Sequence, residues 1–124
     1  MSDKKRILAI DDDPDILQAV KAILNSAGFE VSTAKSAKDG LEYIDSVKPD
    51  LVLCDMMMES VDAGIAFAND FRNKYPDIPV YLMSSIGDAT AENIEIEKIG
   101  FKGVFQKPID PEVLLSTVKA FLKE

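Results

Sequence analysis

Five short apolar runs recur along the chain at nearly even spacing, and each is followed by a segment with helical periodicity. The runs cover residues 7–10, 29–34, 51–54, 80–83 and 103–106. Strands that alternate with helices favour right-handed crossovers, which make the strands parallel and cover both faces of the sheet. The first and third runs are apolar throughout, as is typical of strands buried on both faces. The alternation therefore predicts an α/β fold built on a five-stranded parallel sheet.

Helix-end signals follow the first two runs. Asp13 and Pro14 are typical of an N-cap and a first-turn proline, and Gly28 predicts where this helix ends. Ser36, with Asp39 three residues later, resembles a capping box at the start of the second helix. The apolar residues expected to face the core from the first helix are Ile16, Val20, Ile23 and Ala27.

The last helix is predicted to begin at Pro111, because proline is favoured in the first turn of a helix. Its apolar stripe is expected to comprise Val113, Leu114, Thr117, Val118 and Phe121. No repeat, linker or low-complexity segment interrupts the chain. Residues 1–124 are therefore interpreted as one domain, with no room for an output domain.

Charge and composition exclude several classes of function. The 22 acidic and 14 basic residues give a formal net charge of −8, whereas nucleic-acid binding usually needs a clustered basic face. With no histidine and one cysteine, the chain cannot carry phosphohistidine or build a His- or Cys-based metal site. No apolar run approaches the roughly 20 residues that span a bilayer, and no signal-peptide pattern follows the basic start. We therefore expect a cytoplasmic protein with neither a nucleic-acid nor a membrane partner.

Polar groups stand at the predicted C-terminal ends of four of the runs. Asp11 and Asp12 follow the first run, Asp55 the third, Ser84 the fourth and Lys107 the fifth. In an open doubly wound sheet, functional groups gather beyond the carboxyl ends of the strands. Taken singly, an acidic group before a helix is usually a solvated cap, and a serine after a strand usually belongs to a turn. The combination at one edge indicates a site.

Crowded carboxylates at that edge require a cation. Two carboxylates about 4 Å apart repel by about 4 kcal/mol at an effective dielectric constant of about 20, which would raise a pKa and neutralise one of them. Mg²⁺ (or Mn²⁺) relieves the repulsion by binding carboxylate oxygens, and it keeps water sites open for a phosphoryl oxygen. Ionised Asp55 can then attack phosphorus, with the metal and Lys107 offsetting the transferred charge and the Ser84 hydroxyl donating to a phosphoryl oxygen.

Four stretches of the chain resemble the receiver family of response regulators, which includes the chemotaxis regulator. They are residues 7–14, 49–55, 76–80 and the pair Lys107-Pro108, and the similarity covers nearly the whole chain. The resemblance implies a flavodoxin-like, doubly wound sheet with strand order 2-1-3-4-5 and five helices. It also implies a cis peptide bond between Lys107 and Pro108, which X-Pro chemistry permits.

The resemblance assigns a role to each residue of the site. Asp55 falls on the phosphoacceptor, Asp12 on the direct metal ligand and Asp11 on an acid that acts largely through water. Met57 falls on the residue that lends a backbone carbonyl to the metal, Ser84 on the switch hydroxyl and Lys107 on the family's lysine. Asp13 is interpreted as a helix cap rather than a ligand.

The predicted switch departs from the family pattern at one position. The hydroxyl is usually paired with an aromatic residue three places before the lysine, and here that residue is Val104. Phe105 stands beside it, but alternation along a strand should point its ring to the opposite face. We therefore expect any switching to depend on Ser84, the adjoining loop and the fourth helix.

The partners follow from the resemblance as well. It implies phosphoryl transfer from a sensor histidine kinase, a histidine phosphotransfer protein or a small phosphodonor, and signalling to an unidentified protein through a surface around the fourth helix and fifth strand. The chain is expected to catalyse only its own phosphorylation and dephosphorylation, and so not to be an enzyme in the usual sense. Whether it is a monomer or a phosphorylation-dependent dimer stays open.

Three other interpretations compete with this one. In a haloacid-dehalogenase-like phosphatase, Asp11 would be the nucleophile and Asp13 the second acid, but the chain is short for that class and Asp55 would be unexplained. An interaction module could keep the receiver shape without phosphorylation, although the acid, hydroxyl and lysine set is complete. A flavodoxin-type cofactor binder is disfavoured because acids after the first strand would repel a flavin phosphate.

Overall fold

The computed structural model describes residues 4–55, 70–85, 102–107 and 109–122. Strands and helices alternate along these segments, and residues 70–74 add a further helical stretch. The elements are β1 (Arg6–Ile10), α1 (Pro14–Ser26), β2 (Glu30–Ala34), α2 (Ala37–Ser46), β3 (Leu51–Asp55), β4 (Val80–Ser85), β5 (Gly103–Lys107) and α5 (Pro111–Leu122). Among the described helices, none is long and apolar enough to cross a membrane.

The five strands form one parallel sheet in the order β2-β1-β3-β4-β5. This confirms the predicted sheet and its strand order. The carboxyl ends of β1, β3, β4 and β5 therefore lie along one edge. The expected fourth helix falls within residues 86–101, outside the described residues, so the prediction of five helices stays a prediction.

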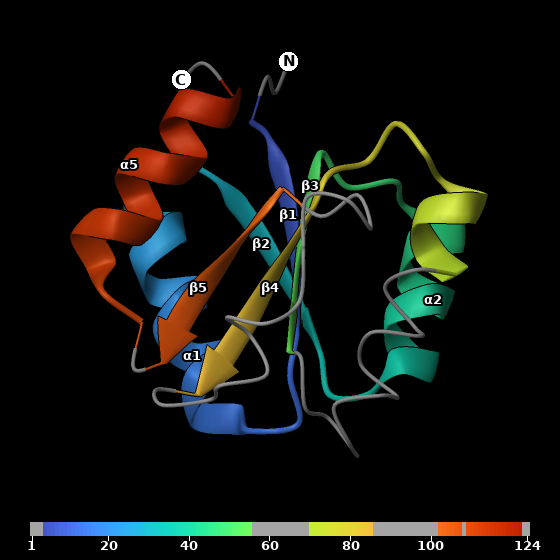
Figure 1. The fold of residues 1–124 in the computed structure, drawn as a ribbon, viewed down its shortest axis with the longest axis horizontal. Coiled ribbons are helices and arrows are strands. Elements are labelled where there is room, and N and C mark those ends of the chain that lie inside the picture. The colour runs from blue at the N-terminus through green and yellow to red at the C-terminus, as the bar shows by residue number, and fades with distance from the viewer. Residues whose placement is uncertain (1–3, 56–69, 86–101, 108, 123–124) are drawn as a thin grey trace.

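Helices cover both faces of the sheet (Figure 1). α1 and α5 pack on one face over a core of buried residues that includes Leu53 and Met83. α2 lies on the other face together with residues 70–74, over a second core that includes Ile10 and Leu82. β1 and β3 contribute side chains to both cores, which explains why their runs are apolar throughout.

The predicted helix ends are confirmed. Asp13 caps α1, since its side chain accepts a hydrogen bond from the Asp15 backbone N–H at 2.9 Å. Gly28 follows the end of α1 with φ of 96°, a left-handed conformation that favours glycine. Ser36 caps α2 by accepting from the Asp39 N–H at 3.1 Å.

The predicted inner faces of two helices need correction. α1 buries Leu17, Val20 and Leu24, while the predicted Ile16, Ile23 and Ala27 pack only at the margin of the core. α5 buries Leu114 and Val118, but Val113 is 50% exposed and Phe121 is 39% exposed. Residues four apart share a helix face, whereas Val113 is turned about 100° from Leu114. The prediction that Val113 belongs to the core is wrong.

A close approach between α2 and β1 fixes the end of the strand that leads into the acidic residues. Gly40 is buried in α2, and a Cβ added there would lie 2.6 Å from Cδ1 of Ile10. Only glycine lets the helix pack at this distance without moving Ile10. The contact therefore holds the residue directly before Asp11 against the second core.

Candidate functional site

The carboxyl edge of the sheet brings the predicted site residues together. Asp55 is the last residue of β3 and Lys107 the last of β5, while Ser84 is the penultimate residue of β4. Asp11 follows β1, and its backbone N–H donates to the Ala34 carbonyl at 3.1 Å, which ties it to the end of β2. Polar side chains buried at such an edge indicate function, because water normally solvates them. Asp11, Asp55 and Ser84 are all buried.

Lys107 joins the two buried acids. Its Nζ lies 2.8 Å from Oδ2 of Asp11 and 3.1 Å from Oδ1 of Asp55. Burial alone would lower the pKa of Lys107, but the two carboxylates more than offset this and raise it. The ammonium group therefore stays charged and neutralises part of the negative charge at the edge.

Asp11 is held on both of its oxygens. Oδ1 accepts a hydrogen bond from the Asp13 backbone N–H at 2.9 Å, and Oδ2 forms the ion pair with Lys107. Burial nevertheless raises the pKa of the Asp11 carboxyl, and the nearby charge of Asp55 adds to the effect, although Lys107 and the Asp13 N–H oppose it. Oδ2 is buried and accepts no hydrogen bond from the described residues, so it remains able to bind a cation.

The role of the Asp13 backbone was missed at the level of sequence. The sequence indicates only a cap for α1 at Asp13, yet the Asp13 N–H also fixes Asp11. The signal is the spacing Asp11-x-Asp13, because an aspartate side chain commonly accepts from the N–H two residues later. One residue thus both starts the helix and orients the acid before it.

Three carboxylates form a cluster that fits a divalent cation. Asp11, Asp12 and Asp55 each offer an oxygen, and these atoms lie within 4.8 Å of one another. Asp11 and Asp55 are buried, whereas Asp12 is exposed. A donor set of oxygens alone, with one member open to water, suits a hard cation such as Mg²⁺ that keeps part of its hydration shell. Met57, the predicted carbonyl ligand, lies outside the described residues.

Val104 and its neighbour Phe105 lie on opposite faces of the sheet, as predicted. Val104 packs at the margin of the second core, while the neighbouring Phe105 is buried in the first. The Phe105 ring therefore cannot take the place of the missing aromatic on the Val104 face. Ser84 is buried at the end of β4. The expected cis bond before Pro108 falls outside the described residues.

Solved structures of other proteins share the fold of this chain. The receiver domain of NtrX from Brucella abortus has a TM-score of 0.85 and 29% identity, and the match covers 94% of this chain and 98% of that one. The chemotaxis response regulator CheY4 of Vibrio cholerae has a TM-score of 0.81 and 28% identity, with the same two coverages. In both comparisons the structural match covers nearly the full length of the two chains.

Curated relatives are longer than this chain. The DNA-binding dual master transcriptional regulator RpaA of Synechocystis sp. is 33% identical over 120 residues, which is 95% of this chain and 49% of the relative. The chain spans 49%, 26% and 53% of the length of three further curated relatives. The family model described as "Response regulator receiver domain" matches residues 7–119. Together with the fold and the edge cluster, this match shows that the chain belongs to the response regulator receiver domain family.

Proposed function

We propose that the chain accepts a phosphoryl group on Asp55 in a Mg²⁺-dependent reaction. The donor is a phosphohistidine of a sensor histidine kinase or histidine phosphotransfer protein, or a small phosphodonor. The observation that carries the proposal is the meeting of Asp55 with Asp11, Asp12 and Lys107 at one sheet edge. No other cluster of three acids with this geometry occurs in the part of the chain that the structure describes.

Each residue at the sheet edge would have a different role in the phosphoryl transfer. An Asp55 carboxylate oxygen attacks phosphorus, the new P–O bond forms, and the bond from phosphorus to the donor nitrogen breaks with its electron pair leaving on the imidazole. Lys107, which contacts Asp55 at 3.1 Å, can move its hydrogen bond to a phosphoryl oxygen. The Ser84 hydroxyl is a further donor on the same edge. Asp11, Asp12 and Asp55 would hold the divalent cation, which supplies positive charge to the transferring group.

The proposal is tested with acetyl phosphate and beryllofluoride in the presence of Mg²⁺. Wild type and the variants Asp55→Asn and Asp45→Asn are compared by intact mass and by mapping of the acid-labile adduct. Asp45 is the matched control, because it is an exposed aspartate that also pairs with a lysine. We expect an adduct in the wild type and in Asp45→Asn, none in Asp55→Asn, and none after chelation of the metal. An adduct that maps to Asp11 would contradict the assignment.

Signalling is proposed to use the surface around the fourth helix and β5. The chain would then act as a signalling phosphoacceptor in the cytoplasm, transforming no substrate other than its own aspartyl phosphate. With Val104 in place of an aromatic, the change at the site would spread through Ser84 and the loop that follows β4. Longer relatives are named as DNA-binding regulators. The net charge of −8 supports protein rather than nucleic-acid contacts for these 124 residues.

A further inference from the structure

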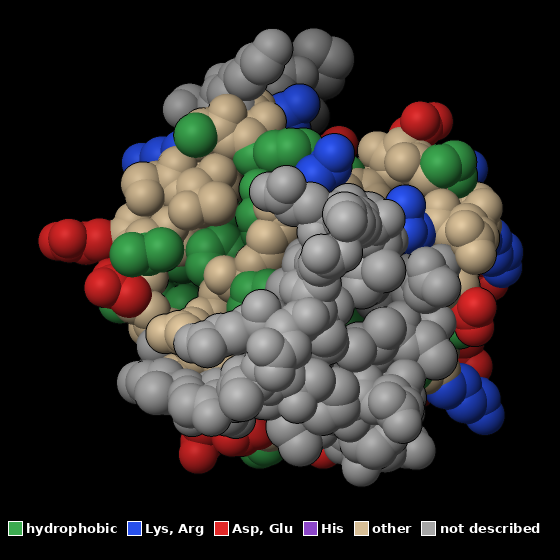
Figure 2. All heavy atoms as spheres, in the orientation of Figure 1, with side chains coloured by type: hydrophobic (Ala, Val, Ile, Leu, Met, Phe, Trp, Pro, Cys, Tyr) green, Lys and Arg blue, Asp and Glu red, His purple; other side chains and the backbone are tan. Residues whose placement is uncertain are grey.

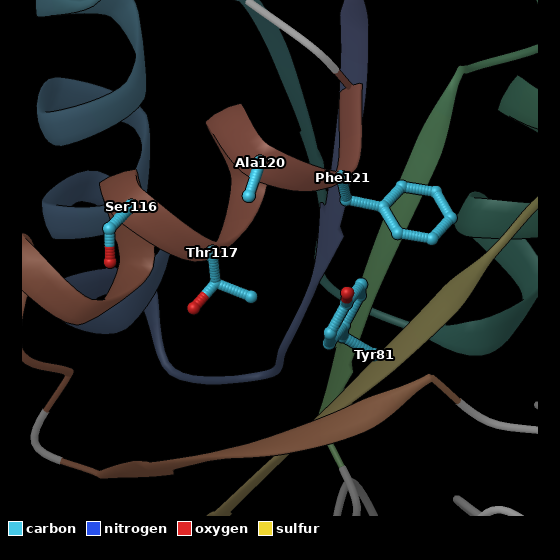
Figure 3. A pocket seen from close by; sticks show the side chains of 5 residues that line it. All are labelled: Tyr81, Ser116, Thr117, Ala120 and Phe121. Carbon is cyan, nitrogen blue, oxygen red and sulfur yellow. The ribbon is translucent and has the colours of Figure 1, made fainter.

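Two of the hollows on the described part of the surface differ in the charges around them. One, of about 510 Å³, is lined by Tyr81 of β4 and by Ser116, Thr117, Ala120 and Phe121 of α5 (Figure 3). Hydrophobic side chains lie at the surface over α5, and acidic groups stand beside the start of that helix (Figure 2). No lysine or arginine is among the described residues that line this hollow, so it has nothing to attract an anion.

The other, which we call the α1–β2 hollow, has a volume of about 370 Å³ and lies between α1 and the edge strand β2. It is lined by Pro14, Leu17, Gln18 and Lys21 of α1, by Thr33 of β2 and by Lys35 just after that strand. Leu17 is 4% exposed and gives the hollow an apolar floor. Sites for small molecules have volumes of roughly 300–1,000 Å³ and combine apolar walls with a few polar groups, so this hollow has the composition of such a site.

The sequence brings two lysines to the α1–β2 hollow from different elements. Lys21 comes four residues after Leu17, so the two side chains share one face of α1. Val31 and Thr33 are two residues apart in β2 and therefore point to the same side of the sheet, where Val31 joins the core that α1 covers. Lys35 lines the hollow two residues after Thr33. The helix and the edge strand thus each contribute one ammonium group.

Neither of these lysines has an acidic partner in the part of the chain that the structure describes. Arg6, Lys74 and Lys107 each form an ion pair with an acid. Lys21 and Lys35 are exposed and form no ion pair or hydrogen bond with the described residues. No acid lines the hollow, although the chain as a whole has a net charge of −8. A hollow that carries one sign of charge beside a low-dielectric wall concentrates ions of the opposite sign.

We propose that the α1–β2 hollow binds a small organic anion, in which a carboxylate or phosphate group is attached to a compact apolar body. The anionic group would contact the ammonium groups of Lys21 and Lys35, and the apolar body would cover Leu17. The Thr33 hydroxyl is a further hydrogen-bond donor to the anionic group. An inorganic anion would leave the apolar floor in water, and a neutral apolar molecule would not use the two charges.

The binding is expected to be weak and to be independent of phosphorylation. Both lysines are exposed, so water and salt compete with the ligand for them. We therefore expect a dissociation constant of about 1 mM for a molecule with one charge and one ring. Neither Asp55 nor a divalent cation takes part, so the site goes beyond the proposed function and can be tested in EDTA.

Titration of the isotope-labelled full chain with benzoate, followed by its amide NMR shifts, tests the site. Benzoate carries a carboxylate on an apolar ring and cannot donate a phosphoryl group. We expect saturable shifts within residues 14–21 and 33–35, which form the walls of the hollow. Acetate and benzyl alcohol each carry only one half of this chemistry and should bind about tenfold more weakly. Shifts confined to the edge around Lys107, or no saturation up to about 20 mM benzoate, would overturn the proposal.

Surface variants separate the hollow from the net charge of the chain. Lys21→Gln and Lys35→Gln should each raise the dissociation constant for benzoate about threefold, because each removes one exposed charge contact. Thr33→Glu should abolish binding, since its carboxylate would occupy the two lysines. Lys38→Gln is the matched control, because it removes an exposed lysine of α2 that does not line the hollow. If Lys38→Gln weakens binding as much as Lys35→Gln, the hollow is not the site. The dispersion of the amide shifts verifies that each variant is folded.

Discussion

Two lysine–aspartate pairs in this protein have the same length and opposite surroundings. Lys107 lies 3.1 Å from Asp55 at the sheet edge, and Lys74 lies 3.1 Å from Asp45 between α2 and residues 70–74. The side chains of the first pair are 16% and 4% exposed, whereas those of the second are 57% and 51% exposed. If distance alone decided, the two ion pairs would contribute equally to stability.

The surroundings of Asp11 and Asp45 shift the pKa values of these two acids in opposite directions. Burial raises the pKa of Asp11, which shares Lys107 with Asp55, and the lysine does not fully offset it. At the exposed pair, the hydrogen bond from the Tyr75 hydroxyl and the contact with Lys74 lower the pKa of Asp45. The buried Asp11 is therefore held in a charged state that its surroundings disfavour, and a cation improves it. The exposed acid is already satisfied by its neighbours and by water.

Removal of each lysine should produce the largest difference between the two regions. Lys107→Met leaves two buried carboxylates without their cation, so we expect a loss of about 3 kcal/mol in the free energy of unfolding without metal. Lys74→Met should lose only a small fraction of that, because exposed ion pairs contribute little. Urea unfolding with EDTA measures both.

Repeating the unfolding experiment with Mg²⁺ distinguishes the two lysine variants further. The metal should recover part of the stability of Lys107→Met, since it supplies the missing positive charge, and should leave the effect of Lys74→Met unchanged. Equal losses for the two variants would mean that burial does not distinguish the pairs.

Metal binding should give the next largest effect. At a Mg²⁺ concentration about ten times the dissociation constant, binding to the folded state alone stabilises it by about 1.4 kcal/mol. Asp12→Asn should lose most of this gain, because it removes the exposed ligand of the cluster. Asp45→Asn should keep the gain in full. Thermal unfolding with and without Mg²⁺ measures this stabilisation. If Asp12→Asn is stabilised by Mg²⁺ as much as the wild type, the metal binds elsewhere.

The edge site could be predicted because it depends on topology. Once alternation of strands and helices implies a parallel sheet, residues at the carboxyl ends of β1, β3 and β5 must meet at one edge, whatever the details of packing. Asp12, Asp55 and Lys107 were assigned in this way. The hydrogen bond from the Asp13 N–H to Asp11 depends on one local turn, which an aspartate at position 11 permits but does not require.

The faces of the helices were predicted less well, because they depend on small rotations. Val113 and Leu114 are both apolar and adjacent, and only the packing of α5 on the sheet decides that Leu114 is buried. The exposed cluster of Asp45 and Lys74 was not predicted at all, since their proximity follows from how two helices lie side by side on the sheet.

The smallest expected effect is a difference in the sign of pH dependence. The folded-state pKa of Asp11 is raised, so the folded protein binds the extra proton first. Without metal, the contribution of Asp11 to stability should therefore grow as the pH falls through the raised pKa towards the ordinary one. The folded-state pKa of Asp45 is lowered, so its contribution is present above the ordinary pKa and should be lost as the pH falls through the lowered one. The free energy of unfolding is measured in EDTA from about pH 7 to about pH 3 for wild type, Asp11→Asn and Asp45→Asn. Subtracting each variant from the wild type should give slopes of opposite sign. Slopes of the same sign would show that Lys107, rather than burial, dominates at Asp11, and that Asp11 needs no further cation for relief.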